Sequence, residues 1–259
     1  MAALGVLDMA SDRPVFQQIA DQLRASISSG SIAAGERLPS EAVLMRHHGV
    51  ARMTVRQALG VLKAEGLVVA EHGRGVFVRP RPVMRRLGSD RFARRHRRRG
   101  RAAFEADAKA AGQYPTVDQL HVTRQRPPED VAKVLGVGAD EEVLVRDRRY
   151  LLDGHPVELA VSYVPLDVAE GTPIRDPDSG PGGIYARMED AGFTFRRFHE
   201  DVTARMPSPE ETRRLDLPPG VPVLTLRRSA VEAGNRVLEV CDTVMAAHSF
   251  VLSYDLPAK

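Results

Sequence analysis

Residues 39–78 read PSEAVLMRHHGVARMTVRQALGVLKAEGLVVAEHGRGVFV, and this stretch decides the fold of the N-terminal part of the chain. Pro39-Ser40-Glu41 supplies a helix cap and a carboxylate for the first turn, and His47-His48-Gly49-Val50 interrupts the helical pattern before it resumes. This spacing predicts two helices joined by a short turn. After Gly66 the period changes to two, which predicts a β-hairpin with the tip Glu71-His72-Gly73-Arg74-Gly75.

The second predicted helix has one apolar and one polar face. Val55, Leu59 and Leu62 recur at helical spacing and are expected to face a core. Arg suits the O6 and N7 atoms of guanine, Gln suits adenine, and hydroxyl groups suit phosphate oxygens. The residues expected to contact double-stranded DNA in the major groove and along its backbone are Arg37, Ser40, Glu41, Arg52, Met53, Thr54, Arg56 and Gln57. Those expected at the minor groove, on the hairpin tip, are His72, Gly73, Arg74 and Gly75. Together the pieces predict a winged helix-turn-helix in which Arg52 and Arg56 read bases.

Charge divides the chain into two parts. Residues 1–101 hold 19 Arg and Lys against 8 Asp and Glu, a net charge of +11. Residues 102–259 hold 18 against 26, a net charge of −8. Basic side chains gain affinity for nucleic acids because they displace counterions from phosphates. Only the N-terminal part is therefore expected to meet a polyanion.

The composition favours a cytoplasmic protein with two domains. A chain of 259 residues is long enough for two domains that each bury a core. The N-terminal segment lacks the features of a signal peptide, and no segment reaches the roughly 20 apolar residues of a membrane span. The single cysteine, Cys241, cannot form an intrachain disulfide and is expected to be a small buried hydrophobe.

Four segments resemble the DNA-binding domain of GntR-family transcriptional regulators. They are residues 14–21, 35–41, 54–59 and 65–78. The resemblance covers about residues 14–79 and implies sequence-specific DNA binding. Met53 departs from it, because many members carry a small polar residue at that position.

The second half of the sequence alternates helical and extended patterns. The predicted helices are residues 104–111, 129–135, 184–191 and 210–215. The predicted strands are residues 143–152, 157–164, 198–205, 223–230, 236–245 and 250–254. The turns Asp153-Gly154 and Gly234-Asn235 predict hairpins. We therefore expect an α+β fold with a mainly antiparallel sheet.

Residues 87–256 resemble the effector-binding (UTRA) domain of the HutC-like branch of the GntR family. The segments that carry the resemblance are residues 148–165, 183–185, 200–205, 222–224 and 238–240. It implies a chorismate-lyase-like fold. The expected organisation is a winged helix-turn-helix DNA-binding domain over 1–79, a basic linker over 80–101 that lies along the DNA backbone or is simply solvated, and an effector-binding and dimerisation domain over 102–259.

A helix start at Gly182-Gly183 and Arg side chains on a neighbouring strand predict an effector pocket for an anion. Arg146 and Arg148 alternate onto the same face of that strand. The residues expected to bind the effector are Phe104, Arg146, Arg148, Tyr150, Ser162, Tyr163, Tyr185, Glu200, Glu239 and Asp242. A second assignment fits equally well, in which these Arg residues pair with Glu158, Glu200, Glu239 or Asp242 in a structural network.

The resemblance argues against an amino-sugar phosphate as the effector. Members that bind sugar phosphates offer a Ser-Phe-Thr triplet, an Arg-x-Arg pair and a Glu after the hairpin turn. This chain has Ala103-Phe104-Glu105, Arg148-Arg149-Tyr150 and Ala160 at the matching positions. Glu105 would repel a phosphate.

The sequence predicts a transcriptional repressor whose operator binding is modulated by a small-molecule effector. The alternative is a constitutive DNA-binding protein with a structural, non-sensing C-terminal domain. We expect a homodimer on a palindromic operator, because one recognition helix reads too few base pairs. No catalysis, cofactor or metal site is expected, since the sequence contains no G-x-S-x-G, H-E-x-x-H or P-loop motif.

Overall fold

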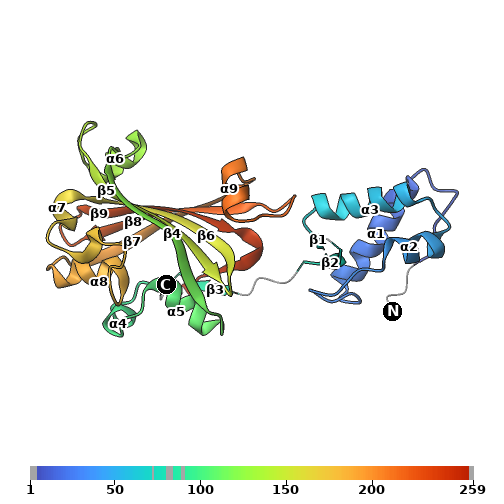
Figure 1. Ribbon diagram of the computed structural model, residues 1–259, viewed down its shortest axis with the longest axis horizontal. Coiled ribbons are helices and arrows are strands. Elements are labelled where there is room, and N and C mark those ends of the chain that lie inside the picture. Colours follow the sequence, from blue (N-terminus) through green and yellow to red (C-terminus); the bar gives the residue numbers. More distant parts are fainter. Residues whose placement is uncertain (1–4, 72, 80–83, 89–90, 257–259) are drawn as a thin grey trace. The chain divides into compact units, whose positions relative to one another are not determined.

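The computed structural model describes residues 5–71, 73–79, 84–88 and 91–256 (Figure 1). They belong to two compact units, one made of residues 1–81 and 218–221 and the other of residues 82–217 and 222–259. The first unit consists of three helices and a two-stranded hairpin. Its elements are α1 Val15–Ser28, α2 Glu41–His48, α3 Arg52–Ala64, β1 Val68–Glu71 and β2 Gly75–Val78.

Local chemistry fixes the ends of α2. The Ser40 hydroxyl oxygen accepts a hydrogen bond from the backbone N–H of Val43 at 3.3 Å, which caps the helix N-terminus. Gly49 adopts φ 64° at the other end, a left-handed conformation that glycine takes without a steric penalty. The chain therefore turns where the sequence predicted, and α3 begins three residues later.

The core of the first unit is built from the apolar stripes of its helices. Val55, Leu59 and Leu62 of α3 are buried, as their spacing predicted, and they belong to the same cluster as Ile19 and Leu23 of α1. This packing leaves the polar face of α3 in solvent. The predicted winged helix-turn-helix is confirmed.

Ser40→Ala should lower the free energy of unfolding of the first unit by about 1 kcal/mol, because the N–H of Val43 loses its acceptor. Thermal unfolding followed by circular dichroism would measure the loss. Ser40→Thr keeps a hydroxyl at the cap and should retain most of the stability. Equal losses in both variants would show that the cap hydrogen bond contributes nothing.

A six-stranded sheet forms the centre of the second unit. Its strand order is β4-β5-β6-β9-β8-β7, and every neighbouring pair is antiparallel. The strands are β4 Pro115–Gln125, β5 Val143–Leu152, β6 His155–Pro165, β7 Phe195–Arg205, β8 Val223–Glu232 and β9 Val237–Ala246. A separate parallel pair joins β3 Met84–Leu87 to β10 Phe250–Ser253. The expected α+β fold on a mainly antiparallel sheet is confirmed.

Short helices cover both faces of this sheet (Figure 1). They are α4 Arg94–Arg98, α5 Ala103–Ala110, α6 Glu129–Leu135, α7 Leu166–Ala169, α8 Gly183–Asp190 and α9 Pro209–Arg214, with the 3-10 turns η1 Pro173–Arg175 and η2 Ala247–Ser249. On one face, α6 packs through Val131 and Leu135 against a cluster that includes Val145. On the other face, α8 packs through Met188 against a cluster that includes Leu144. Successive residues of β5 therefore point into different cores.

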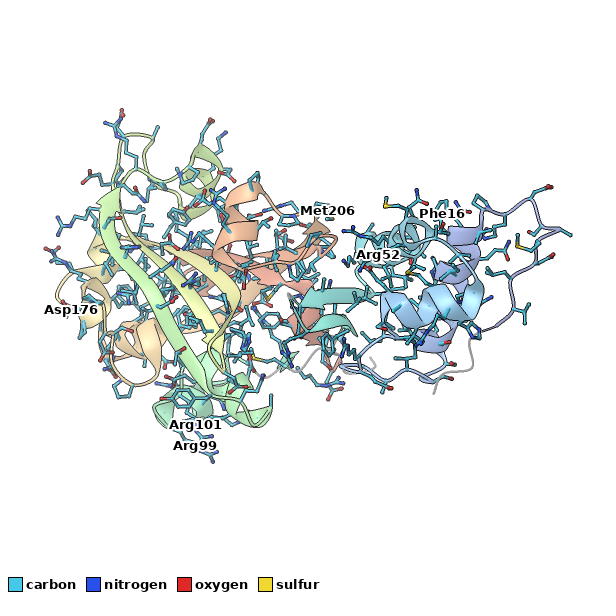
Figure 2. The ribbon with its side chains drawn as sticks, turned by 45° about the vertical axis from the view of Figure 1, so that its right-hand side comes forward. Phe16, Arg52, Arg99, Arg101, Asp176 and Met206 are labelled. Atoms are coloured by element: carbon cyan, nitrogen blue, oxygen red, sulfur yellow. The ribbon has the colours of Figure 1, made fainter. Side chains whose placement is uncertain are left out.

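Two features of the second unit differ from the sequence expectations. The edge strand β4 is half exposed and contains a register shift between Asp118 and His121, so its sequence lacks a clean alternation. Part of the expected linker over 80–101 is also regular structure, because β3 and α4 lie within it. Arg99 and Arg101, at the surface in Figure 2, keep the solvated character expected of that stretch.

Candidate functional site

The outward face of α3 presents the polar residues that the sequence singled out. Arg52 and Arg56 have side chains 71% and 63% exposed, and Figure 2 shows Arg52 on the surface of the first unit. Met53 and Gln57 are exposed beside them, and Thr54 is half-buried. A carboxylate oxygen of Glu41 on α2 lies 2.9 Å from Nε of Arg52, and the other lies 4.0 Å from Nε of Arg56. Glu41 therefore holds both guanidinium groups at the start of α3.

The hairpin and the loop before α2 lie against each other. The backbone N–H of Leu38 donates to the carbonyl of Val76 at 2.8 Å, and the Arg37 guanidinium lies so close to Gly75 that a Cβ there would meet its Nε at 2.7 Å. Gly75 has φ 128°, which also requires glycine. Arg74 forms an ion pair with Glu71 and lies over the ring of Phe77. Arg37, Gly73 and Arg74 are exposed, whereas His72 lies outside the described residues.

A cavity of about 740 Å³ lies in the second unit above the centre of the six-stranded sheet. Strands β5, β6, β8 and β9 supply its floor, and the segment 177–185, which includes the start of α8, closes one side. Residues 91–92 and 100–105 close another side. The expected convergence of the hairpins on the helix start at Gly182-Gly183 therefore exists.

The structure brings six of the ten expected effector residues to this cavity. The six are Phe104, Arg146, Arg148, Tyr150, Tyr185 and Glu239. Ser162 lies at its edge, where its hydroxyl oxygen accepts a hydrogen bond from Arg148.

The other three expected residues are placed elsewhere. Tyr163 and Asp242 lie on the opposite face of the sheet, because side chains alternate along a strand. There Tyr163 packs beside the α6 cluster, and Asp242 accepts hydrogen bonds from Arg227 at 2.7 and 2.8 Å. Glu200 is engaged by Arg86 at 2.9 Å. The effector assignment of Tyr163 and Asp242 is therefore corrected, whereas Glu200 lies 3.7 Å from the cavity residue Arg228 without lining the cavity itself.

Several cavity residues were not expected from the sequence. They are Arg91, Phe92, Glu158, Arg228, Cys241 and Thr243. Side chains alternate between the two faces of a sheet along a strand, and this rule could have identified three of the six. Glu158 shares a face with Ser162, and Cys241 and Thr243 share a face with Glu239. Arg91 and Phe92 carry no such signal, since they come from the stretch that reads as a linker.

The two Arg residues of β5 do not form the network with carboxylates that the second assignment required. Arg146 donates to the backbone carbonyls of Ile174, Asp176 and Pro177, the last two at 2.5 and 2.9 Å. Burial lowers the pKa of Arg146 to about 10, so it stays charged at neutral pH. Arg148 donates to Ser162. Both remain cations at the cavity.

A hydrogen-bonded chain of Arg228, Tyr185 and Glu239 connects β8, α8 and β9. Nε of Arg228 donates to the Tyr185 hydroxyl at 2.7 Å, and that hydroxyl donates to Glu239. Burial raises the pKa of Tyr185 well above its usual value, so the hydroxyl keeps the proton that it donates. The Arg228 guanidinium also lies 4.7 Å from the centroid of the Phe92 ring.

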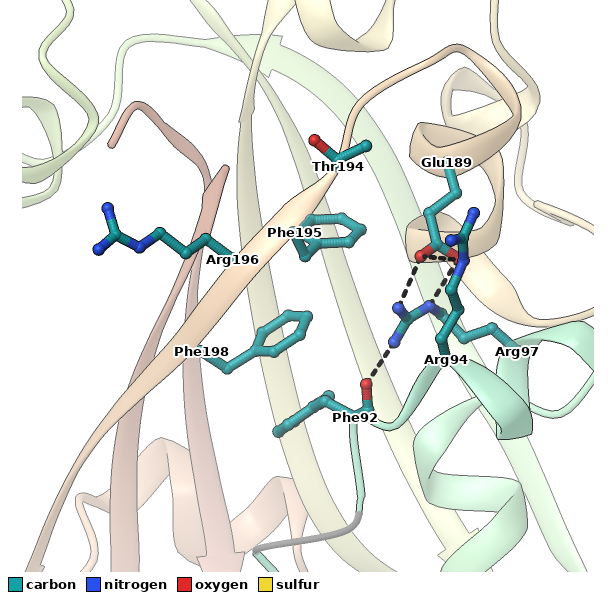
Figure 3. Close-up of a pocket in the computed structure, with 8 residues that line it drawn as sticks. All are labelled: Phe92, Arg94, Arg97, Glu189, Thr194, Phe195, Arg196 and Phe198. Atoms are coloured by element: carbon teal, nitrogen blue, oxygen red, sulfur yellow. Dashed lines mark hydrogen bonds and ion pairs between the residues drawn. The ribbon is translucent and has the colours of Figure 1, made fainter. Parts of the chain in front are cut away.

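A smaller cavity of about 260 Å³ adjoins the same aromatic residues (Figure 3). The rings of Phe92 and Phe198 are stacked with centroids 4.5 Å apart, and Phe195 lies 5.2 Å from Phe198. Arg97 of α4 binds Glu189 of α8 at 2.9 and 2.7 Å and donates to the backbone carbonyl of Phe92. Phe92 therefore lines both cavities, and it is tied through Arg97 to α4 and α8.

Comparison with known proteins accounts for both units. The sequence model named "Bacterial regulatory proteins, gntR family" matches residues 16–78, and that of the UTRA domain matches residues 110–251. An uncharacterized HTH-type transcriptional regulator from Streptomyces coelicolor is 34% identical over 253 residues, which are 95% of this chain and 94% of that protein. This chain belongs to the GntR family of regulators.

Two further relatives agree with this assignment. The HTH-type transcriptional repressor NagR of Bacillus subtilis is 27% identical over 86% of each chain. The crystal structure of a putative GntR-family transcriptional regulator is 30% identical, with a TM-score of 0.64 over 96% of this chain and 99% of that chain. The protein is thus a transcriptional regulator with an N-terminal GntR DNA-binding domain and a C-terminal UTRA domain.

No helix among the described residues is both long and apolar enough to cross a membrane. No group of three or more His, Cys, Asp or Glu side chains in the described part of the chain is arranged to hold a metal ion.

Proposed function

We propose that this GntR-family regulator is a repressor that binds a palindromic operator as a homodimer and releases it when an effector occupies the 740 Å³ cavity of the UTRA domain. The observation that carries the proposal is the pair of cations on the wall of that cavity, the buried Arg146 and the half-buried Arg148. Arg146 and Arg148 form no ion pair with a carboxylate among the described residues, and desolvated cations of this kind favour an anionic ligand in the cavity.

DNA recognition is assigned to the exposed face of α3 and to the wing. Arg52 and Arg56 read base edges in the major groove, and Arg37, Ser40, Thr54 and Gln57 contact the backbone. Gly73, Arg74 and Gly75 follow the minor groove. The contact of Glu41 with Arg52 at 2.9 Å restricts the Arg52 side chain before DNA binds, which lowers the entropy lost on binding.

Effector occupancy is coupled to the DNA-binding domain through residues 84–101. Arg91 and Phe92 of this stretch line the cavity, and β3 and α4 of the same stretch are anchored in the UTRA domain. An effector that displaces Phe92 from Arg228 would shift α4 through Arg97. The ligand thereby favours one of two arrangements of the chain, as population shift requires.

The proposal is tested by selecting DNA that the purified protein binds from a random library. An enriched inverted repeat, bound with one dimer per site in sedimentation analysis, is the expected result. Metabolite pools are then screened for fractions that stabilise the protein and release the selected DNA. Selection of a site without twofold symmetry, or stabilisation without any release, would contradict the proposal.

Arg148→Gln should weaken effector binding about tenfold or more while leaving operator affinity unchanged, because a charge-assisted hydrogen bond at a buried site is lost. The effector concentration that releases half of the operator measures the change. Arg126→Gln removes the same charge from an exposed position and should leave that concentration unaltered. If Arg148→Gln lowered operator affinity in the absence of effector, its role would be structural.

A further inference from the structure

The effector cavity has a positive side on β5. Among the described residues, the partners of Arg146 and Arg148 are three backbone carbonyls and the Ser162 hydroxyl. Nε of each of these Arg residues is buried and has no hydrogen-bond acceptor in the described ranges of the chain. Within the described part of the chain, no carboxylate forms an ion pair with either guanidinium group, so the cavity wall attracts a negatively charged group.

The same cavity has a negative side on β6 and β9. Glu158 and Glu239 are 3% and 0% exposed, and one carboxylate oxygen of each lacks a hydrogen-bond donor within the described chain. Together with Glu200 they share two cations: Arg86 lies 2.9 Å from Glu200 and 3.9 Å from Glu158, and Arg228 lies 3.8 Å from Glu239. Arg91, which also lines the cavity, forms its own ion pair with Asp107, so three carboxylates face two remaining guanidinium groups and one negative charge is left.

Strand register sets the separation of the two sides. Arg148 is paired with Ala160, and Tyr150 is paired with Glu158, so Arg148 and Glu158 are diagonal neighbours whose Cα atoms are about 7–8 Å apart. Ala160 is paired in turn with Thr243 on β9. These small side chains leave room above the sheet between the positive and the negative side.

We propose that the effector is a zwitterion, with a carboxylate bound by Arg148 and an ammonium group bound by Glu158, an inference that rests on the proposed function of this cavity. The helix start at Gly183, which also lines the cavity, adds backbone dipoles for the carboxylate. A purely anionic effector would leave the free oxygens of Glu158 and Glu239 buried without donors. Glu105 on the cavity lining disfavours a doubly charged phosphate.

The test uses four matched probes that differ in one group: 4-(aminomethyl)benzoate, 4-(hydroxymethyl)benzoate, 4-methylbenzoate and benzylamine. Their ring suits the aromatic lining formed by Phe104, Tyr150 and Tyr185. Titration calorimetry of the full chain at constant ionic strength should give about tenfold or greater preference for the aminomethyl acid over each of the others.

Two variants locate the preference. Glu158→Gln should bring the affinity for 4-(aminomethyl)benzoate down to that for 4-methylbenzoate, whereas Glu170→Gln, an exposed glutamate outside the cavity, should preserve the difference. The probe series on the unaltered chain is decisive even if Glu158→Gln fails to fold. Equal affinity for the methyl or hydroxymethyl acid, or no binding of the aminomethyl acid, would overturn the zwitterion proposal. The proposed function itself would survive either result, because it is tested separately by the symmetry of the selected DNA and by the release of that DNA when a metabolite binds.

Discussion

Arg86→Ala should lower the free energy of unfolding of the UTRA domain by about 3–5 kcal/mol, the cost of removing one partner from a buried ion pair. The Arg86 side chain is 1% exposed, and it lies 2.9 Å from Glu200 and 3.9 Å from Glu158. Nη1 also contacts the sulfur of Met245 at 3.3 Å. Without the guanidinium group, Glu158 and Glu200 would stay buried without their Arg86 ion pairs, and Glu200 would keep Arg228 at 3.7 Å.

The neighbouring residue provides a matched control. Arg85 stands on the same strand but is exposed, and it donates one hydrogen bond to Ser253 at 3.1 Å. Arg85→Ala should therefore change the stability by about 0.5 kcal/mol or less. The chain has no tryptophan, and its five tyrosines all follow residue 113, so tyrosine fluorescence during urea unfolding reports the UTRA domain alone. Similar losses in both variants would show that the buried ion pairs add no stability.

Arg56→Ala should weaken binding to the selected operator by about 1–3 kcal/mol and leave binding to random DNA nearly unchanged, because an Arg that reads guanine contributes mainly to discrimination. The Arg56 side chain is 63% exposed and lies on the polar face of α3, so its removal should not disturb the core. Fluorescence anisotropy with both DNAs at one salt concentration measures the two affinities.

The control for Arg56 removes the same charge elsewhere. Arg213 on α9 is exposed, and Arg213→Ala should alter neither affinity. Equal weakening of operator and random DNA in Arg56→Ala would assign this side chain to the phosphate backbone. If Arg56→Ala again preferred specific over random DNA once one base pair of the operator was changed, that base pair would contain the base that Arg56 reads.

The winged helix-turn-helix was predictable because its signals are local. The Ser40 cap, the left-handed Gly49 and the apolar spacing of Val55, Leu59 and Leu62 each act within a few residues. The hairpins of the UTRA domain were predictable for the same reason, since Asp153 and Asn235 take the positive φ that their turns require. Strand β4 escaped prediction because its register shift and exposed edge remove the alternation on which the pattern depends.

The cavity was predictable only in part. The alternation of Arg146 and Arg148 placed both on one strand face, and the structure places both on the cavity wall. Assigning Tyr163 and Asp242 to the cavity was wrong, because adjacent residues of a strand point to opposite faces. Arg91 and Phe92 escaped prediction. A run of basic residues in a stretch that contains Pro and Gly has the same sequence pattern whether the segment is solvated or packed against the domain.

The sequence alone determined the DNA-binding fold, the polar face of α3 and the family, because these depend on residues close together in the chain. Only the tertiary structure decided which charges meet at the cavity. Arg86 reaches Glu200 and Glu158 because β3 pairs with β10, more than 160 residues away. The balance of charge around the effector site therefore depends on strand pairings between distant segments, and no local pattern encodes them.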